Sequence, residues 1–211
     1  MHDIDKLPAN ALKMSHLEHD LGVAGFCYLR VVPGVWDAGV MDNITALGHE
    51  LGYHYEDLAI AKGDLSKAMA HFETRLAQFR HIYPVTTICM HGSPLSRHDN
   101  RALWKTCDYR EFGIIGEPCF DVDYTQVFYL TDTGRRWNHA GASIRDRVDS
   151  GFDIRVNSTA HLAVLASQGA LPDQVMITVH PQRWHDRAVP WVKELVWQNV
   201  KNTVKKAGVT H

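Results

Sequence analysis

The chain has 211 residues, of which 45% are hydrophobic and 22% charged, and its formal net charge is −2. This length fits one domain with a substantial core, and the near balance of charge argues against a nucleic-acid-binding surface. No stretch is long and apolar enough to cross a membrane, and no signal peptide is visible.

The four cysteines show no CxxC pair and are best interpreted as reduced thiols of a cytoplasmic protein. Cys27 and Cys89 fall inside predicted strands, whereas Cys107 and Cys119 fall outside them. A secreted protein with two disulfides is the alternative interpretation.

The predicted helices and strands alternate along the chain. Pro8 suits the first position of a helix, and Asp37 and Asp64 suit the caps of two more, each ahead of apolar residues at helical spacing. Continuous apolar runs predict buried strands. In chain order we expect helix Pro8–Asp20, strand Val23–Val32, a helix from Asp37 to Gly48, strand Leu51–Tyr55, a helix over Leu65–Phe79, strands Val85–Met90 and Val127–Leu130, helix Thr159–Gln168, strand Val175–Val179 and helix Ala188–Lys206.

Strands that are continuously apolar favour a parallel sheet covered by helices, and therefore an α/β fold in a single domain over residues 1–211. In such folds, polar residues at the carboxyl ends of strands meet in one crevice. Three polar clusters have this placement: residues 2–5 (HDID), 49–57 (HELGYHYED) and 180–184 (HPQRW).

Asp3 and Asp5 alternate at the start of the chain. On an extended strand they point to the same side, where two carboxylates repel unless a cation or proton lies between them. That arrangement provides one metal ligand and one general base. A disordered acidic N-terminus is the alternative. Since the chain starts at Met1, the strand that should precede this pair is expected to be missing.

Two histidines lie within or directly after apolar runs. His54 falls in the strand-like segment Leu51–Tyr55, and His91 follows Val85–Met90. A neutral imidazole at either place can bind a divalent metal. The alternatives are a helix-ending turn with exposed histidines, which we assign to His49, and a plain strand-ending turn after His91.

Another cluster follows the predicted strand Val127–Leu130. Asp132 is placed to orient a catalytic histidine, Arg135 to hold a carboxylate in its ionised form, and Trp137 to stack on a sugar face. A loop salt bridge explains the same residues almost as well.

His180 ends the last predicted strand, where a general acid can protonate a leaving amine. Arg183 and Trp184 follow it and are predicted to contact substrate, with Arg135 or Arg183 suited to a phosphate or carboxylate group. The alternative is that His180 is a structural histidine.

Taken in order, these clusters resemble the polysaccharide deacetylases of the NodB-homology type, and more narrowly the WbmS-like deacetylase-like proteins of surface-polysaccharide biosynthesis. The segments that carry the resemblance span almost the whole chain, and their order is more specific than any one of them. They are HDID (2–5), LGHELGYHYEDL (47–58), MHGSP (90–94), YLTDTGRRW (129–137) and HPQRW (180–184). The resemblance implies a distorted (β/α) barrel, here lacking its first strand, that removes the acetyl group from an N-acetylated sugar.

The resemblance also implies roles for the acid–base residues. Asp3 resembles the catalytic base, and His180 resembles the catalytic acid near the C-terminus. Asp132 and Arg135 resemble the supporting residues that tune the base and the acid.

The implied metal is divalent and commonly zinc. Asp5 resembles the metal-binding aspartate, and His54 resembles the first metal-binding histidine. The family's second histidine comes four residues after the first, where this chain has Leu58, which cannot bind a metal. Three protein ligands are usual for catalytic zinc, so the third is expected from His91 first and from Glu56 second.

The function expected from the sequence is metal-dependent removal of an acetyl group from an N-acetylated sugar or related amide in cell-surface polysaccharide metabolism. Leu58 and the missing strand favour an alternative, a catalytically inactive barrel that binds glycan or supports an assembly. Hydrolysis of a small cyclic amide uses the same machinery on another substrate. The sequence leaves the oligomeric state open.

Overall fold

The computed structural model describes residues 1–137, 148 and 151–208, with the side chains of 204–208 excepted. The chain divides into two compact units, unit 1 (Met1–Val122) and unit 2 (Asp123–His211). Each unit is described by itself. The prediction of one deacetylase-like domain over residues 1–211 stays a prediction.

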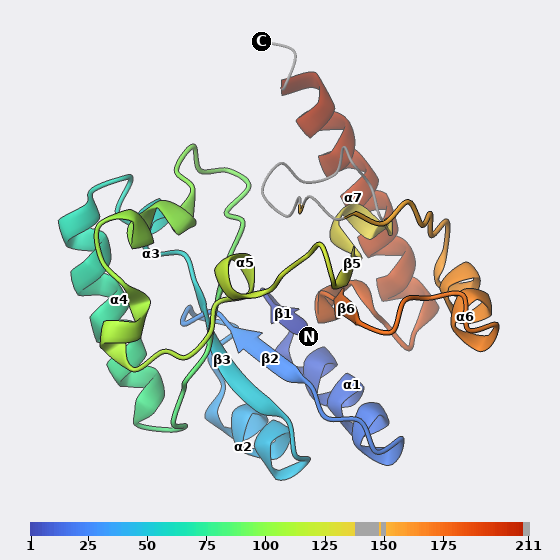
Figure 1. The fold of residues 1–211 in the computed structure, drawn as a ribbon, viewed down its shortest axis with the longest axis horizontal. Helices are drawn as coiled ribbons and strands as arrows, with labels where there is room; N and C mark the ends of the chain where they lie inside the picture. Colours follow the sequence, from blue (N-terminus) through green and yellow to red (C-terminus); the bar gives the residue numbers. More distant parts are fainter. Residues whose placement is uncertain (138–147, 149–150, 209–211) are drawn as a thin grey trace. The chain divides into compact units, whose positions relative to one another are not determined.

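Unit 1 is built on a four-stranded parallel sheet in the order β1-β2-β3-β4 (Figure 1). The strands follow one another in both sequence and space, as consecutive βα units do. This order is compatible with a segment of a (β/α) barrel, and closure of a barrel stays a prediction. The strands are β1 (His2–Ile4), β2 (Phe26–Leu29), β3 (Glu50–Tyr55) and β4 (Ile88–Met90).

Three helices of unit 1, α1, α2 and α4, begin where the sequence predicts, whereas the short helices α3, α5, η1 and η2 were not predicted. Pro8 occupies the first turn of α1, while the side chains of Asp37 and Asp64 accept backbone N–H groups at 3.1 Å and so cap α2 and α4. The helices are α1 (Pro8–Asp20), α2 (Ala38–Ala46), α3 (Asp57–Ile60), α4 (Leu65–Arg80) and α5 (Pro118–Asp121), with 3₁₀ helices η1 (Asn100–Lys105) and η2 (Tyr109–Phe112).

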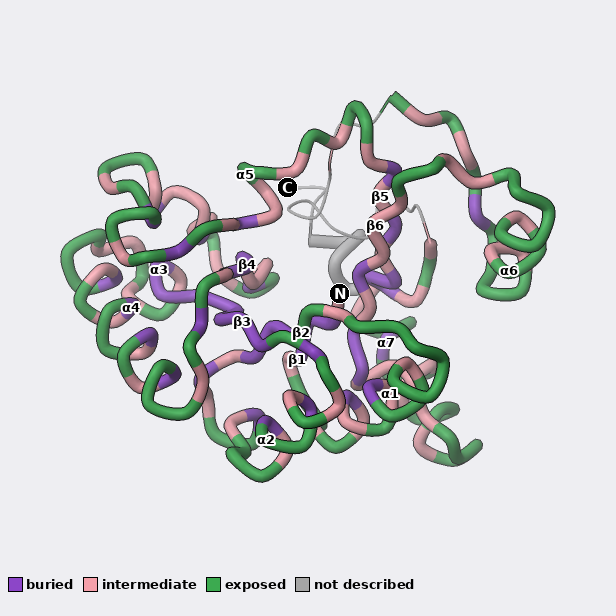
Figure 2. The backbone as a smooth tube through the Cα atoms, turned by 60° about the horizontal axis from the view of Figure 1, so that its bottom comes forward, coloured by how far each residue is buried: buried purple, intermediate pink, exposed green. Residues whose placement is uncertain are grey.

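The register of the sheet separates an apolar face from a polar one. Ile4 pairs with Leu29, Leu29 with Tyr53, and Tyr53 with Ile88. These four side chains are buried in one core cluster with Phe72 and other apolar residues of α1, α2 and α4. In Figure 2 most of the backbone of β2 and β3 has the colour of buried residues. The helices therefore cover this face of the sheet.

The opposite face carries the alternate residues of the same strands. Asp3 pairs with Tyr28, Tyr28 with Gly52, and His54 with Cys89. None of these five residues belongs to the core cluster under the helices. A Cβ on Gly52 would lie only 2.4 Å from Cε1 of Tyr28, so glycine is required where the Tyr28 ring crosses β3.

The expectation that the first strand is missing is wrong. His2–Ile4 forms β1, which pairs in parallel with β2, and Asp3 lies within it. The predicted strand Val23–Val32 shortens to β2, because the ladder ends at Leu29 where its partner β1 stops. Strand β4 is also shorter than the apolar run that predicted it.

Unit 2 contains two parallel strands, β5 (Phe128–Thr131) and β6 (Val175–Thr178), paired from Phe128↔Val175 to Thr131↔Thr178. The predicted helices are confirmed as α6 (Thr159–Ser167) and α7 (Ala188–Gly208), and short 3₁₀ helices η3 (Thr133–Arg135) and η4 (Pro181–Arg183) follow the two strands. A small apolar cluster around Phe128, Leu130 and Val156 forms the core of this unit. In the described part of the chain, no helix combines the length and apolar character needed to span a membrane.

A buried carboxyl group fastens α5 to the last strand of unit 1. Glu117 is fully buried and accepts the backbone N–H of Met90 at 3.0 Å and that of Cys119 at 2.5 Å. Burial outweighs these donors and raises the pKa of Glu117 to about 7.

We predict that Glu117 makes unit 1 less stable as pH rises. Its pKa lies above the ordinary value of 4.5, so the folded state holds more protons than the unfolded state between about pH 4.5 and 7. The contribution to the free energy of unfolding should fall by about 3 kcal/mol over this window. Urea unfolding of Glu117→Gln should show a flatter pH dependence than the unchanged protein, and the exposed Glu73→Gln should not. Parallel profiles for Glu117→Gln and the unchanged protein would contradict it.

Candidate metal centre

Three side chains from the carboxyl ends of β1, β3 and β4 come together in unit 1. Asp5 follows β1, His54 lies near the end of β3, and His91 follows β4. Asp5 Oδ1 is 3.4 Å from His54 Nε2 and 3.5 Å from His91 Nε2. Ligand atoms of all three residues lie within 4.8 Å of one another, as a shared metal ion requires.

The second nitrogen of each imidazole is fixed by an acceptor. His54 Nδ1–H donates to the Cys89 carbonyl at 2.9 Å, and His91 Nδ1 lies 2.9 Å from Glu56 Oε2. A carbonyl or an ionised carboxylate only accepts, so Nδ1 carries the hydrogen in both rings. Each Nε2 is therefore the nitrogen directed at Asp5, which is how histidines that bind metal are usually oriented.

Arg30 joins the elements behind this centre. Its guanidinium forms an ion pair with Glu56 and donates to the Asp5 carbonyl at 3.4 Å. Burial alone would raise the pKa of Glu56, but His91 and Arg30 outweigh it and hold that pKa below its usual value. Glu56 therefore stays ionised and orients His91. Arg30 follows β2 directly, so its strand-end position was the only sequence signal for this role.

The carboxylates of Asp3 and Asp5 favour a positive charge at His54. Burial alone lowers the pKa of His54, but the carboxylates of Asp3 and Asp5 and the Cys89 carbonyl raise it to about 9. With this raised pKa the imidazole of His54 is protonated at neutral pH and forms an ion pair with Asp5, whose Oδ1 lies 3.4 Å from Nε2. Either a proton or a cation satisfies the two carboxylates.

Asp3 lies beside the same imidazole. Rather than continuing straight, the chain turns after β1, where the Asp5 N–H donates to the Asp3 carbonyl at 3.1 Å. Asp3, His54 and Cys89 form a second group whose ligand atoms lie within 4.8 Å of one another. Both aspartates lie near His54, but not on the single extended strand that the sequence predicted, because β1 ends at Ile4 and the chain turns before Asp5.

The geometry favours His91 over Glu56 as the third ligand. His91 presents Nε2 to Asp5, whereas Glu56 lies behind His91 and contacts its Nδ1. Leu58 is buried in the apolar core of unit 1, on the short helix α3. Leu58, which stands where the resemblance would place a second metal-binding histidine, therefore serves packing in this chain.

Unit 2 holds a separate cluster around Asp132, which follows β5. Its carboxylate accepts His180 Nδ1–H at 2.6 Å, Arg183 Nη1–H at 2.8 Å and Trp184 Nε1–H at 2.8 Å. The backbone N–H of His180 donates to the same carboxylate at 3.1 Å. Burial alone would raise the pKa of Asp132, but His180, Arg183 and Trp184 lower it below its usual value.

Asp132, which the sequence predicted to orient a catalytic histidine without identifying it, contacts His180 in the structure. The neighbouring residues have other partners than those predicted. Arg183, predicted to bind substrate, pairs with Asp132. Arg135 donates instead to the Arg183 carbonyl at 3.2 Å, and its guanidinium lies 4.8 Å from the Trp191 ring centre. Arg183, rather than Arg135, therefore pairs with the ionised carboxylate.

The predicted substrate-binding tryptophans also have partners within unit 2. Trp137 donates to Thr159 Oγ1 at 3.2 Å and packs against the core of unit 2, while Trp184 Nε1 donates to Asp132. The predicted union of these residues with those of unit 1 in one site stays a prediction.

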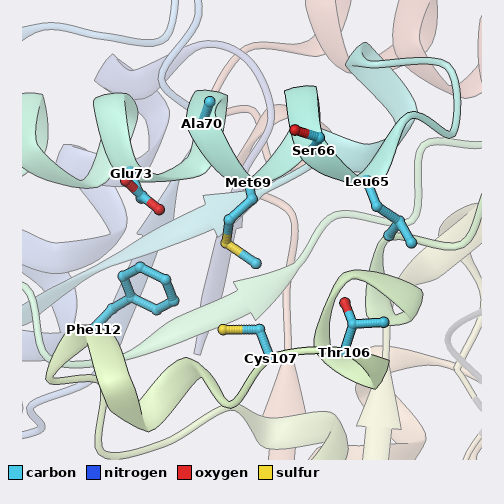
Figure 3. Close-up of a pocket in the computed structure, with 8 residues that line it drawn as sticks. All are labelled: Leu65, Ser66, Met69, Ala70, Glu73, Thr106, Cys107 and Phe112. Atoms are coloured by element: carbon cyan, nitrogen blue, oxygen red, sulfur yellow. The ribbon is translucent and has the colours of Figure 1, made fainter.

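A pocket on α4 lies apart from the predicted site residues, none of which lines it. Figure 3 shows Met69 of α4 facing Cys107 and Phe112 across this pocket. Its lining is mainly apolar and includes no pair of acid–base groups suited to hydrolysis. It lends no support to the predicted chemistry.

Comparisons with protein-family models, curated proteins and solved structures find no match for this chain.

We predict that Asp132→Asn destabilises unit 2 at neutral pH by about 3–5 kcal/mol, because it leaves buried donors without their charged acceptor. The pKa of Asp132 is lowered in the fold, so this stabilisation is present above the unfolded pKa and is lost as pH falls through the folded value. The free energies of unfolding of the two proteins should therefore converge in acid. Chemical unfolding followed by tryptophan fluorescence measures both free energies of unfolding as a function of pH. The exposed Asp173→Asn should change stability by less than about 0.5 kcal/mol, and an equal effect of both substitutions would contradict the prediction.

Proposed function

We propose that this protein is a metal-dependent hydrolase that removes an acetyl group from an N-acetylated sugar or a related amide. One observation carries the proposal: two imidazoles, each with Nδ1 held by an acceptor, direct Nε2 at the carboxylate of Asp5. Imidazole and carboxylate are the donors of many catalytic zinc sites.

The donor set fits a divalent ion. Asp5, His54 and His91 would hold it, and their three ligands leave a position for water or substrate. The side chains of Asp5 and His91 are 17% and 14% exposed, whereas Asp5 Oδ1, the oxygen that faces both imidazoles, is buried. A bound ion supplies Lewis-acid chemistry, because it lowers the pKa of water and polarises a carbonyl group.

Asp3 is the candidate base. It is nearly buried and lies next to His54, so its carboxylate is held beside the ligands rather than in bulk water. In the proposed reaction Asp3 accepts the proton of the attacking water. It cannot be replaced by Asn, which has no basic oxygen.

His180 is the candidate acid, and its surroundings within unit 2 suit that role. Asp132 accepts its Nδ1–H and stabilises the imidazolium form, which leaves Nε2–H as the proton to donate. In the proposed reaction His180 protonates the departing amine. Arg183 keeps Asp132 ionised and so maintains the orientation of the ring.

The acetylated sugar as substrate rests on the resemblance of the ordered clusters to polysaccharide deacetylases. An inactive barrel that binds glycan is the outcome favoured if the protein holds no metal.

We predict that the protein binds about one zinc ion per chain and that His54→Ala abolishes this binding, because His54 lies at the centre of the ligand set. The number of zinc ions bound per chain is measured after dialysis against a zinc-containing buffer and then against a metal-free buffer. His16, which is exposed on α1, provides a matched control: His16→Ala should retain the metal. Zinc retained by His54→Ala, or absent from the unchanged protein, would refute the proposed centre.

We predict that the zinc- or cobalt-loaded protein releases acetate from N-acetylated sugars. Asp3→Asn and His180→Ala should each lower kcat by about 10²–10⁴-fold, the usual contribution of a general base or acid. Both variants should still bind metal, which separates loss of catalysis from loss of the centre. Unchanged acetate release by Asp3→Asn would show that the assigned base is wrong.

A further inference from the structure

A second set of ligands shares His54. Asp3, His54 and Cys89 come from β1, β3 and β4, and their ligand atoms lie within 4.8 Å of one another. All three are buried, with 8%, 2% and 4% of their surfaces exposed. They lie on the polar face of the sheet, where His54 and Cys89 are register partners.

Cys89 differs from the other buried cysteine of unit 1. Cys27 is fully buried within the core cluster under the helices, where its Sγ lies 3.9 Å from Ser15 Oγ. Cys89 is equally inaccessible, but it lies outside that cluster and beside an imidazole and a carboxylate. Cys27 therefore packs as a small apolar residue, whereas Cys89 has the neighbours of a metal ligand.

The two ligand sets differ in charge and exposure. Asp5, His54 and His91 carry one negative charge and reach solvent. Asp3, His54 and a Cys89 thiolate carry two negative charges, which neutralise a divalent ion in a buried place. Buried, thiolate-containing sites favour soft ions such as Zn²⁺ and Cd²⁺ over Mg²⁺ or Ca²⁺.

We propose that Asp3, His54 and Cys89 form a second, thiolate-containing position for a soft divalent metal ion. Cys89 forms a sulfur–metal bond and releases its thiol proton to solvent, so the step needs no oxidant or reductant. Because His54 Nδ1 donates to the Cys89 carbonyl, only Nε2 remains for a metal, and the two positions exclude each other. An ion in the buried position also occupies Asp3, the candidate base, and so blocks hydrolysis. The inference does not depend on hydrolytic activity.

Cobalt(II) tests the proposal directly, since cobalt bound to thiolate gives a charge-transfer band in the near ultraviolet. Titration of the unchanged protein should give this band while the total bound cobalt stays at about one ion per chain, because the two positions share His54 and the ion divides between them. Cys89→Ser should lose the band, and its affinity for Cd²⁺ should fall by at least the roughly 10–100-fold that loss of a supporting residue costs. Cys27→Ser should keep the band, and circular dichroism should verify that each variant is folded.

His91→Ala separates this position from the catalytic one. It removes a ligand only from the Asp5 set, so the thiolate band should persist in this variant, whereas His54→Ala should remove both the band and the bound ion. Absence of the band from the unchanged protein, or its persistence in folded Cys89→Ser, would overturn the second position. Zinc bound without a thiolate band would leave the proposed hydrolase intact, whereas zinc retained by His54→Ala would refute the proposed catalytic centre.

Discussion

The structure of unit 1 depends on compensation of the negative charge around one imidazole. Asp3 and Asp5 both act on His54, and burial makes uncompensated charge costly at this place. A proton on His54 compensates this negative charge, in agreement with the raised pKa of His54. A divalent ion compensates the same charge, and in doing so it displaces that proton. The charged groups at the end of this sheet are thus arranged for a cation.

The surrounding residues make this arrangement specific. The Cys89 carbonyl fixes His54, while Glu56, held by Arg30, fixes His91. These contacts determine which nitrogen of each ring faces Asp5, and therefore where an ion would be bound. Asp132 does the same for His180 in unit 2, with Arg183 in the supporting role. In both units a carboxylate that is paired with an arginine orients a histidine, so the predicted chemistry rests on supporting contacts as well as on the reacting groups.

The polar face of the sheet gives the chain more ligands than one metal ion needs. His54 belongs to two sets, one partly exposed and one buried with Cys89. The register explains why, because His54 and Cys89 are paired across β3 and β4 while Asp3 lies on the same face of β1. The shared imidazole makes the two sets alternatives, so the choice of metal and its position would control whether Asp3 is available as a base.

Local pattern in the sequence was sufficient for most elements and for naming the residues that meet in the candidate metal centre. Pro8, Asp37 and Asp64 begin helices because their preferences act over a single turn, and His54 and His91 were assigned from apolar runs that end in polar residues. Only the tertiary structure decided the contacts: that residues 2–4 form a strand, that His91 rather than Glu56 faces Asp5, and that Arg183 rather than Arg135 holds Asp132. Those outcomes depend on register and side-chain direction between segments far apart in the chain, which a sequence pattern does not specify.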